Sequence, residues 1–462
     1  MDNGLSKCPK CGATDISVNE KTGKLRCNFC RYEFEAVSSN MDSEDTVFAL
    51  HGEQISSGLG DINKVASNLI TLKCTACGAE VVIDTQQSMQ ARCHWCRNTL
   101  SVNSRIENGA VPDMILPFAT QKQEAQELLK SYINHHRFFA HPRFLRDFSA
   151  DNIMGVYFPY MVVDANTHVR FEGSGEIEIR SYTVGQGDDE ETVYDADLYN
   201  IGREFDLGID DLTIESSSKR MTQTASETNN IINAILPFDT ENCVDFNANY
   251  MKGVSSEKRD VDINDMRQAV GAQIADIARF RANQLASQYD RGICWSTEDI
   301  KYIGLKWKAA YLPVWLYSYF QPNNRMLHYV AVNARTNETV GSIPINKLRL
   351  FLVSAVIEIA SLVLFILIMI SGVFEDSDGD DPWEFGLILV AGFLFYAWQY
   401  ARYRRMDERH YHEKETRTYT RNEAAYDDLV EHREGLRNAK YEYANNDRID
   451  GVVINMTGGK KK

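Results

Sequence analysis

Eight cysteines, arranged as four Cys-x-x-Cys pairs, constrain the fold of this 462-residue chain more than any other feature. Fifteen residues separate the first two pairs, and fifteen separate the last two, so one spacing occurs twice. Each pair makes a tight turn that directs two sulfur atoms at one point, and two such turns can surround a tetrahedral ion. The sequence therefore predicts two four-cysteine metal sites, formed by Cys8, Cys11, Cys27 and Cys30 and by Cys74, Cys77, Cys93 and Cys96.

We expect each site to bind one zinc ion, because this spacing of cysteine pairs is a zinc signature. Disulfides are the alternative, but Met1–Lys10 is too polar for a secretory signal, and a reducing compartment favours thiolate ligation. Four cysteine ligands leave no open coordination position, so both ions are predicted to be structural. Gly12 and Gly78 follow the first pair of each site, where such a turn often needs a positive φ. The two remaining cysteines, Cys243 and Cys294, are expected to be buried.

Basic and aromatic residues lie among the cysteines, and they leave two interpretations open. Each four-cysteine segment looks like a zinc ribbon. The residues are Lys24, Arg26, Phe29 and Arg31 in the first ribbon and Arg92, Trp95 and Arg97 in the second. Such residues can stack on bases and contact phosphates. We favour the alternative, in which the two aromatic side chains pack the ribbon cores and the arginines are solvated. Residues 1–104 carry 10 basic and 12 acidic residues, which is not the charge of a nucleic-acid-binding surface.

The whole chain carries 65 acidic and 49 basic residues, a net charge of −16, which argues against non-specific adhesion to nucleic acid. Between Asp188 and Glu215 eleven acidic residues accompany a single basic one, Arg203. A run of this kind predicts a solvated loop or an edge strand, with a cation site or a site for a basic partner as the alternative.

Two apolar stretches predict a membrane hairpin. Leu350–Phe374 contains one charge in 25 residues, Phe385–Tyr400 is shorter, and the acidic loop 375–384 joins them. Basic residues flank the pair on its outer sides, at Lys347, Arg349, Arg402, Arg404, Arg405 and Arg409. The positive-inside rule therefore predicts a two-span protein of the cell membrane with both termini in the cytoplasm.

Glu358 lies near the middle of the first apolar stretch, with Ser354 and Ser361 on the same helical face. An ionisable residue inside a membrane is a functional candidate by default. We expect it to join two helices or two protomers through hydrogen bonds, and a role in transport by an oligomer is the alternative.

The middle of the chain contains a second repeat. Ile115–Thr120 reads ILPFAT and Ile235–Thr240 reads ILPFDT. A helix is predicted after each motif, the first begun by a capping box of Thr120 and Gln123 and the second over Asp265–Tyr289. Alternating patterns predict strands at Val169–Val184, Glu191–Asn200, Ala310–Phe320, Leu327–Asn333 and Thr339–Ile343. Strands mixed with separate helices indicate an α+β fold with an antiparallel sheet.

The order of these motifs resembles a bacterial membrane-protein family, the TFIIB-type zinc ribbon-containing proteins, whose activity is undefined. The predicted organisation is ribbon 1 (1–36), linker (37–70), ribbon 2 (71–104), α+β domain (105–345, with units at about 111–215 and 231–345), span 1 (350–374), acidic outside loop (375–384), span 2 (385–400) and charged cytoplasmic helical tail (401–462).

No phosphate-binding loop, HExxH or GxSxG motif occurs in the chain, so we expect no catalytic activity. The predicted function is a membrane-anchored scaffold or regulator that faces the cytosol and binds a protein partner. The first alternative is a membrane-tethered protein linked to nucleic acid or transcription, and the second is an oligomeric transport component that uses Glu358. The expected partners are the lipid bilayer and an unidentified protein, with a second copy of the chain as a further candidate.

Overall fold

The fold combines α and β structure, as the sequence predicts. The computed structural model describes residues 8–11, 13, 16–19, 24–34, 47–56, 69–76, 78–85, 91–106, 112–184, 191–216, 235, 238–259, 261, 263–289, 291–321, 326–341, 343–370, 390–407, 440–443 and 452–455. These residues form one small sheet, one large sheet and a few helices.

The small sheet contains β1 (Ile16–Val18), β2 (Leu25–Cys27) and β3 (Glu33–Phe34) in that order. Three long strands dominate the large sheet: β9 (Met154–Val184), β10 (Glu191–Glu215) and β13 (Arg291–Gln321). Its shorter strands are β4 (Gly52–Ile55), β5 (Leu69–Lys73), β6 (Glu80–Asp84), β7 (Arg105–Ile106), β8 (Met114–Ile115), β11 (Val244–Asp245), β12 (Ser255–Glu257), β14 (Met326–Asn333), β15 (Thr339–Gly341), β16 (Lys440–Tyr443) and β17 (Val452–Asn455). The helices are α2 (Lys122–His135), α3 (Pro142–Asp147), α5 (Ile263–Leu285), α6 (Lys347–Ile370) and α7 (Ala391–Asp407), with 3-10 turns at Val102–Ser104, Ala150–Asn152, Thr240–Asn242 and Ala248–Met251.

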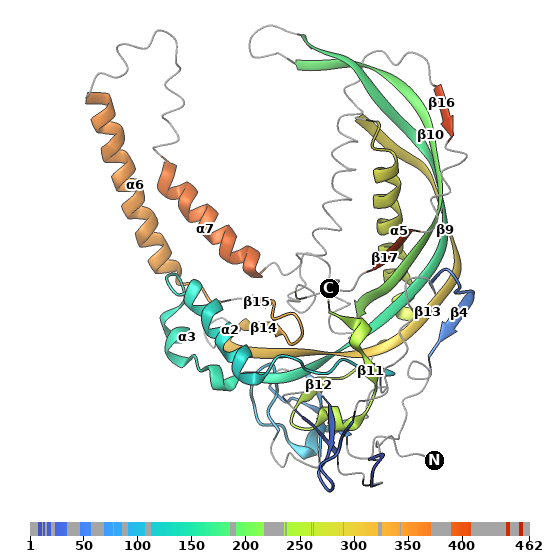
Figure 1. The fold of residues 1–462 in the computed structure, drawn as a ribbon. Coiled ribbons are helices and arrows are strands. Elements are labelled where there is room, and N and C mark those ends of the chain that lie inside the picture. Colours follow the sequence, from blue (N-terminus) through green and yellow to red (C-terminus); the bar gives the residue numbers. More distant parts are fainter. Residues whose placement is uncertain are drawn as a thin grey trace.

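The strand β9 is the centre of the large sheet and is antiparallel to both of its long neighbours, β13 and β10 (Figure 1). Four of the five predicted strands lie within β9, β10, β13 and β14, and the fifth, predicted over Thr339–Ile343, corresponds to β15, which ends at Gly341. The strands β9 and β13 each extend over 31 residues. Strands usually have about 3–10 residues. These curve strongly along their length in Figure 1, and their register shifts at several points, for example between Ile209 and Leu212 of β10. Such irregularities increase the local bend and twist of a strand.

The two faces of β9 belong to two different cores, because successive side chains of a strand point to opposite sides. Phe158 and Tyr160 pack with the second ribbon. Met161 and Val163 pack instead with the apolar face of α5, which lies on the concave side of the sheet in Figure 1. The helix predicted over Asp265–Tyr289 is thus confirmed, with a start two residues earlier and an end at Leu285.

The large sheet is mixed rather than purely antiparallel, which corrects the sequence-based prediction. The short strands β4 and β8 run parallel to β13, and β12 runs parallel to β9. These strands come from segments distant in sequence, and parallel pairing needs a long crossover that a local pattern does not reveal.

The capping box predicted at the start of α2 is also wrong. The residue that caps this helix is Gln121, and its side chain makes no capping hydrogen bond. The Thr120 hydroxyl instead donates to Asn337 Oδ1 at 2.5 Å. The backbone N–H of Thr120 donates to Ala334 O at 2.8 Å, so this residue is held by the turn between β14 and β15 rather than by its own helix.

That turn between β14 and β15 joins the two ILPF motifs. The Arg335 guanidinium donates to Pro117 O of the first motif at 3.2 Å and to both carboxylate oxygens of Asp239 in the second, at 2.5 to 3.0 Å. Asn333 Nδ2 donates to Ile235 O at 2.9 Å. The repeat therefore supplies two similar segments that meet at one turn of the sheet.

The helical tail predicted over 401–462 is wrong at two described segments, which are strands. The strand β16 pairs in parallel with β10 from Tyr199, and β17 does so from Leu207. The edge of β10 offers backbone N–H and C=O groups for such pairing, and the run of β-branched residues in Val452–Asn455 favours a strand. Residues 408–439 lie outside the described part of the chain.

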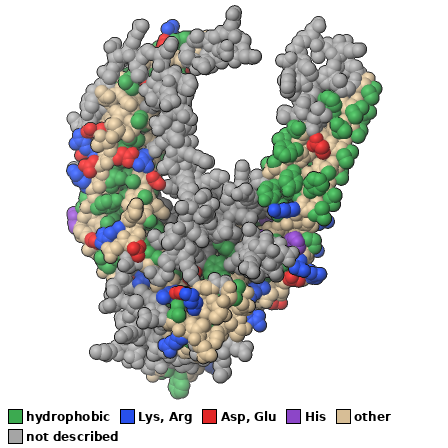
Figure 2. All heavy atoms as spheres, turned by 180° about the vertical axis from the view of Figure 1, so that it is seen from behind, with side chains coloured by type: hydrophobic (Ala, Val, Ile, Leu, Met, Phe, Trp, Pro, Cys, Tyr) green, Lys and Arg blue, Asp and Glu red, His purple; other side chains and the backbone are tan. Residues whose placement is uncertain are grey.

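Among the described residues, α6 is the one helix that is long and apolar enough to cross a membrane. The candidate span, Lys347–Leu367, has 21 residues and therefore a length of about 31 Å, close to the roughly 30 Å of a bilayer core. Only 17 % of its most apolar stretch is buried, and hydrophobic side chains cover its surface in Figure 2.

The second predicted span, Phe385–Tyr400, is described only in part. The helix α7 begins at Ala391 and continues to Asp407, while 385–389 and the acidic loop 375–384 lie outside the described residues. It runs back along α6 (Figure 1), and Lys347 Nζ of α6 lies 5.7 Å from the centre of the Tyr400 ring. The described residues thus form a packed helix pair with one candidate span.

Candidate metal centres

The four predicted ligands of the first site lie together beside the small sheet. The Sγ atoms of Cys8, Cys11, Cys27 and Cys30 are all within 4.8 Å of one another. Cys8 Sγ is 3.5 Å from Cys30 Sγ, and Cys11 Sγ is 3.6 Å from Cys27 Sγ. Sulfur atoms placed tetrahedrally at about 2.3 Å from one ion would be about 3.8 Å apart. The cluster therefore has the size of a metal centre.

Three predicted ligands of the second site also converge. The Sγ atoms of Cys74, Cys93 and Cys96 lie within 4.8 Å of one another, with 3.4 Å between Cys74 and Cys96. The fourth predicted ligand, Cys77, lies outside the described residues. No disulfide joins any of the nine described cysteines. The separations are far longer than an S–S bond of about 2.05 Å. Both clusters can thus hold a metal ion.

The same backbone turn carries every cysteine pair. The N–H of the first cysteine donates to the carbonyl five residues later, at 2.7 to 3.0 Å, in all four pairs: Cys8 to Ala13, Cys27 to Tyr32, Cys74 to Ala79 and Cys93 to Asn98. Gly78 follows its pair with a φ of 77°, as predicted, whereas Gly12 lies outside the described residues. Arg31 and Arg97 take the equivalent positions with φ of 58° and 63°. This conformation is uncommon for arginine, so the turn itself imposes it.

The thiols of the first site cannot all ionise independently. Burial disfavours the charged form of Cys8, but hydrogen bonds from the backbone of Cys11 and Lys10 outweigh it and lower the Cys8 pKa to about 7. The backbone hydrogen bond at Ala13 favours the Cys11 thiolate, but burial and the neighbouring thiols outweigh it and raise the Cys11 pKa to about 12. A bound dication would stabilise all four thiolates together, and ligand deprotonation is part of metal binding to cysteine.

The first ribbon rests on the large sheet without joining it. Its three strands pair only with one another among the described residues. Ile16 and Leu25 are buried in a cluster with Tyr250 and Met251 of the main body. A hydrogen bond from Lys252 Nζ to Ile16 O, at 2.6 Å, adds a polar contact.

The second ribbon is part of the large sheet. Its strand β6 pairs with β12, with Ser255 opposite Ile83, and β12 in turn pairs with β9. The ligands Cys74 and Cys93 belong to the same buried cluster as Phe158 of β9. The second metal centre is therefore built into the core of the sheet.

The equivalent aromatic residues of the two ribbons differ in burial. Trp95 is 8 % exposed and packs against Phe158 and Tyr329, with ring centroids 5.8 and 5.1 Å away, as the core-packing interpretation predicts. Phe29 is 81 % exposed, which contradicts that interpretation for the first ribbon. The first ribbon is too small to bury its central aromatic residue, whereas the second has the large sheet behind it.

Three further residues that could ligate a metal, His94, Cys243 and Cys294, belong to neither cysteine cluster. His94 is buried, and its Nδ1 lies 3.2 Å from Ser255 Oγ. Cys243 is buried as predicted, and burial raises the pKa of its thiol. Cys294 is exposed, contrary to prediction, because it lies towards the outer end of β13.

The acidic run between Asp188 and Glu215 is solvated only in part. Residues 185–190 lie outside the described residues, and the remainder forms β10. Asp210 and Asp211 are only 6 % and 3 % exposed and lie with Asp164 of β9 in a third group with metal-binding geometry. Sequence reasoning missed this group, because its partner Asp164 is 46 residues away from Asp210 and only the register of the strands joins them.

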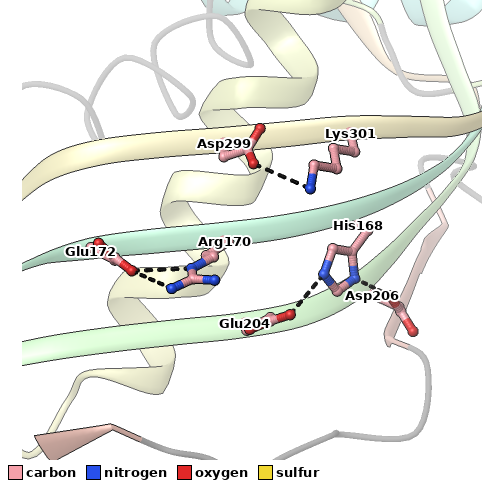
Figure 3. Close-up of polar contacts among 7 residues, drawn as sticks. All are labelled: His168, Arg170, Glu172, Glu204, Asp206, Asp299 and Lys301. Atoms are coloured by element: carbon pink, nitrogen blue, oxygen red, sulfur yellow. Dashed lines mark hydrogen bonds and ion pairs between the residues drawn. The ribbon is translucent and has the colours of Figure 1, made fainter.

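The outer face of the long strands carries charged side chains that pair with one another. Figure 3 shows His168 of β9 between Glu204 and Asp206 of β10, with Nδ1 2.7 Å from Asp206 and Nε2 3.0 Å from Glu204. The hydrogen bond to Asp206 is the largest cause of a raised His168 pKa. Arg170 and Glu172 pair at 2.6 Å along the same face. Both carboxylates favour the protonated form of the imidazole.

Glu358 joins α6 to α7. Its Oε2 accepts a hydrogen bond from the Gly392 backbone N–H at 2.7 Å. A Cβ atom at Gly392 would lie 2.3 Å from Ser354 O, so only glycine allows this approach of the two helices. The carboxylate thus has the helix-joining contact that the sequence leads us to expect.

Comparison of the chain with protein-family models, with curated proteins and with solved structures finds no match in any of the three. The resemblance to the TFIIB-type zinc ribbon-containing family therefore stays a prediction from motifs.

Proposed function

We propose that this chain is a membrane-anchored zinc-ribbon protein that holds a large β-sheet at the cytoplasmic side of a membrane and acts there as a non-catalytic scaffold for a protein partner. The observation that carries the proposal is α6, whose exposed apolar surface is long enough to cross a bilayer. Apolar surface of this extent is stable only when lipid or protein covers it.

Hydrogen bonds at the first turn of α6 connect this helix to the rest of the protein and support its role as an anchor. Asn346 Oδ1 accepts from the Arg349 N–H at 3.1 Å and so caps the start of the helix. The Asn346 N–H donates to Phe139 O at 2.7 Å, and Arg349 Nη1 donates to Phe138 O at 2.9 Å. These contacts connect the first turn of the helix to the loop between α2 and α3, and both of these helices pack against β13 and β14 of the sheet.

The orientation in the membrane follows from the basic residues. Lys347 and Arg349 begin α6, and further arginines follow Tyr400, which places these ends on the cytoplasmic side if the apolar stretch 385–400 crosses as a second span. The acidic loop 375–384 then lies outside. A cytoplasmic sheet agrees with the cysteine clusters, since a reducing compartment preserves thiolate ligands.

We assign zinc to both cysteine clusters. Thiolate ligands in a four-cysteine set favour zinc and give it a structural role. The Cys8, Cys11, Cys27 and Cys30 thiols supply a complete set, and Cys77 completes the second. The metal would hold the chain turns together, and no reaction step is assigned to it.

Two contacts favour a scaffold over an enzyme or a transporter. Both ring nitrogens of His168 contact carboxylates of the neighbouring strand, at 2.7 and 3.0 Å. Glu358 uses an oxygen to join α6 to Gly392. Both groups therefore support structure.

The anchor can be tested by replacing exposed apolar residues of α6 with charge. Val356 and Ile359 are 66 % and 63 % exposed. A charged residue at the centre of a span costs about 2.5–3.5 kcal/mol, so Val356→Lys with Ile359→Lys should move the protein from carbonate-washed membranes to the soluble fraction. Ile179→Lys is the matched control, because Ile179 is equally exposed at 62 % but lies on β9. Retention of the double variant in the membrane would contradict the anchor.

The topology can be tested with a membrane-impermeant maleimide on intact cells. Cys294 is exposed on β13 and reports the side of the sheet. A Ser377→Cys variant reports the side of the acidic loop. We expect labelling of the variant in intact cells and labelling of Cys294 only after permeabilisation. Reaction of Cys294 in intact cells would place the sheet outside and overturn the cytoplasmic assignment.

The metal and the partner have separate tests. Elemental analysis of the purified full-length protein should give two zinc ions per chain, and a value near one or zero would contradict the assignment.

Crosslinking in membranes should capture a protein at a constant ratio to this chain. Recovery of only a second copy would replace the scaffold with a homo-oligomer, and recovery of the monomer alone would reject both.

A second candidate, nucleic-acid binding by the first ribbon, is favoured by one observation. Phe29 is 81 % exposed, and Tyr32 beside it is 43 % exposed, with Lys10 Nζ 5.6 Å from the Tyr32 ring. Exposed aromatic rings among basic residues can stack on bases of single strands. Phe29→Ala should then weaken binding of a single-stranded oligonucleotide, in a salt-dependent assay of the full-length protein, while Tyr182→Ala on β9 should leave it unchanged. Absence of wild-type binding at low salt would eliminate this candidate.

A further inference from the structure

Three buried carboxylates lie between β9 and β10, away from the cysteine clusters. Asp164, Asp210 and Asp211 are 5 %, 6 % and 3 % exposed. One carboxylate oxygen of each lies within 4.8 Å of one oxygen of each of the others. Anionic groups are almost never buried together unless a partner of opposite charge or a proton compensates them.

An irregularity in β10 brings the three side chains together. Ile209 is paired with Ala165 and Leu212 with Val163, so that Asp210 and Asp211 together lie opposite Asp164. The extra residue forms a bulge, and Asp211 has a φ of 59°. Without the bulge, neighbouring residues of a strand would point to opposite faces.

One oxygen of the group lacks a partner, and this observation points to a ligand. Asp211 Oδ2 accepts from the Thr240 hydroxyl at 2.8 Å, and the Asp211 N–H donates to Asp164 Oδ1 at 3.0 Å. Asp211 Oδ1 is fully buried, and no described residue donates a hydrogen bond to it. A buried acceptor without a donor carries the whole cost of its lost hydration.

The electrostatics of the group agree with a missing positive charge. Burial and the repulsion of Asp164 and Asp210 raise the Asp211 pKa to about 8, although the Thr240 hydrogen bond and the attraction of Lys308 act in the opposite direction. The attraction of Lys308 thus compensates Asp211 only in part. A proton or a metal cation can supply the remainder.

We propose that Asp164, Asp210 and Asp211 form a binding site for one hard divalent cation, Mg²⁺, Mn²⁺ or Ca²⁺, between β9 and the bulge of β10. The ligands are carboxylate oxygens, which these cations prefer and which differ from the thiolates of the ribbons. The orphaned Asp211 oxygen becomes a ligand. The cation connects the antiparallel strands β9 and β10 to Thr240, at the end of the second ILPF motif, and lies beside the Leu207–Asp210 segment with which β17 pairs.

The test uses Mn²⁺ as the probe, because its unbound form is counted directly by electron paramagnetic resonance. The full-length protein in detergent, with its zinc retained and other divalent cations removed, should bind one Mn²⁺ per chain, and Mg²⁺ or Ca²⁺ should displace it. Failure of the wild-type protein to bind Mn²⁺ at this ratio overturns the proposal, whatever the variants do.

Matched variants locate the site. Asp211→Asn preserves the size of the side chain and should weaken Mn²⁺ binding by about tenfold or more. Asp206→Asn removes the same charge from the same strand but at a partly exposed position beside His168, and it should leave Mn²⁺ affinity within about twofold of the wild-type value. Equal affinity of the Asp211 variant and the wild type, or equal loss in both variants, overturns the proposal. Zinc content and circular dichroism check the fold, and Asp210→Asn replaces Asp211→Asn if the latter misfolds.

Discussion

The two cysteine clusters share a spacing and a backbone turn, yet the chain around them differs. The first lies on a three-stranded sheet that contacts the main body through Ile16 and Leu25. The second lies in a ribbon whose strand β6 pairs with β12, and its ligands belong to the core that also contains Phe158. One local motif thus produces a docked module in one place and an integral part of a sheet in the other.

This difference predicts different consequences of metal loss. Metal-binding free energy is folding free energy for whatever structure the ligands hold together. For the first cluster that structure is a small ribbon. For the second it includes the packing of Trp95 on Phe158 and the pairing of β6 with β12, so a change at the metal centre should reach the large sheet.

The largest effect is expected for Cys93→Ser, which removes a fully buried ligand of the second cluster. We expect one metal ion per chain to be lost and the free energy of unfolding of the large sheet to fall by at least about 3 kcal/mol. Hydrogen exchange of the β9 amides and denaturant unfolding would measure the effect. Unchanged protection of residues 156–163 would show that the second ribbon is independent of the sheet.

Trp95→Ala tests the packing of the second ribbon on the sheet without changing a metal ligand. Truncating a buried tryptophan costs about 3–5 kcal/mol, because its contacts with Phe158 and Tyr329 are lost. The metal content should stay at the wild-type value. A loss below about 1 kcal/mol would mean that the metal, and not the aromatic core, connects the ribbon to the sheet.

Cys27→Ser is the counterpart of Cys93→Ser in the first ribbon. It should also remove one metal ion, but we expect the unfolding free energy of the large sheet to change by less than about 1 kcal/mol. Increased hydrogen exchange should be confined to β1–β3 and the adjoining turn Ala248–Met251, which β1 contacts. Destabilisation equal to that of Cys93→Ser would erase the distinction between the two clusters.

The smallest effect is expected for Phe29→Ala. Phe29 is 81 % exposed, and substitutions at such positions usually change stability by no more than about 0.5 kcal/mol. Thermal unfolding and metal content should match those of the wild-type protein. A larger loss would show that Phe29 packs against the chain, as Trp95 does.

The sequence alone was sufficient to predict those features whose determining interactions are local. The ligands of the first cluster are two tight turns at a fixed spacing, and the described ligands of the second follow the same rule. The apolar composition of α6 likewise belongs to a single segment, as does the alternation of Val169–Val184 and Ala310–Phe320, which predicted parts of β9 and β13. The helix α5 was predictable for the same reason, since its apolar face repeats along one helix.

Only the tertiary structure decided which surface each local element meets. Trp95 and Phe29 hold equivalent places in equivalent turns, and the presence or absence of the large sheet behind them makes one buried and the other exposed. Thr120 does not cap α2 as predicted, and its hydroxyl instead donates to Asn337, more than two hundred residues away. Asp211 meets Asp164 because a bulge sets the register of two strands. Spacing along the chain determines turns and periodic faces, whereas burial and charge clustering depend on contacts between distant segments, which a single sequence does not specify.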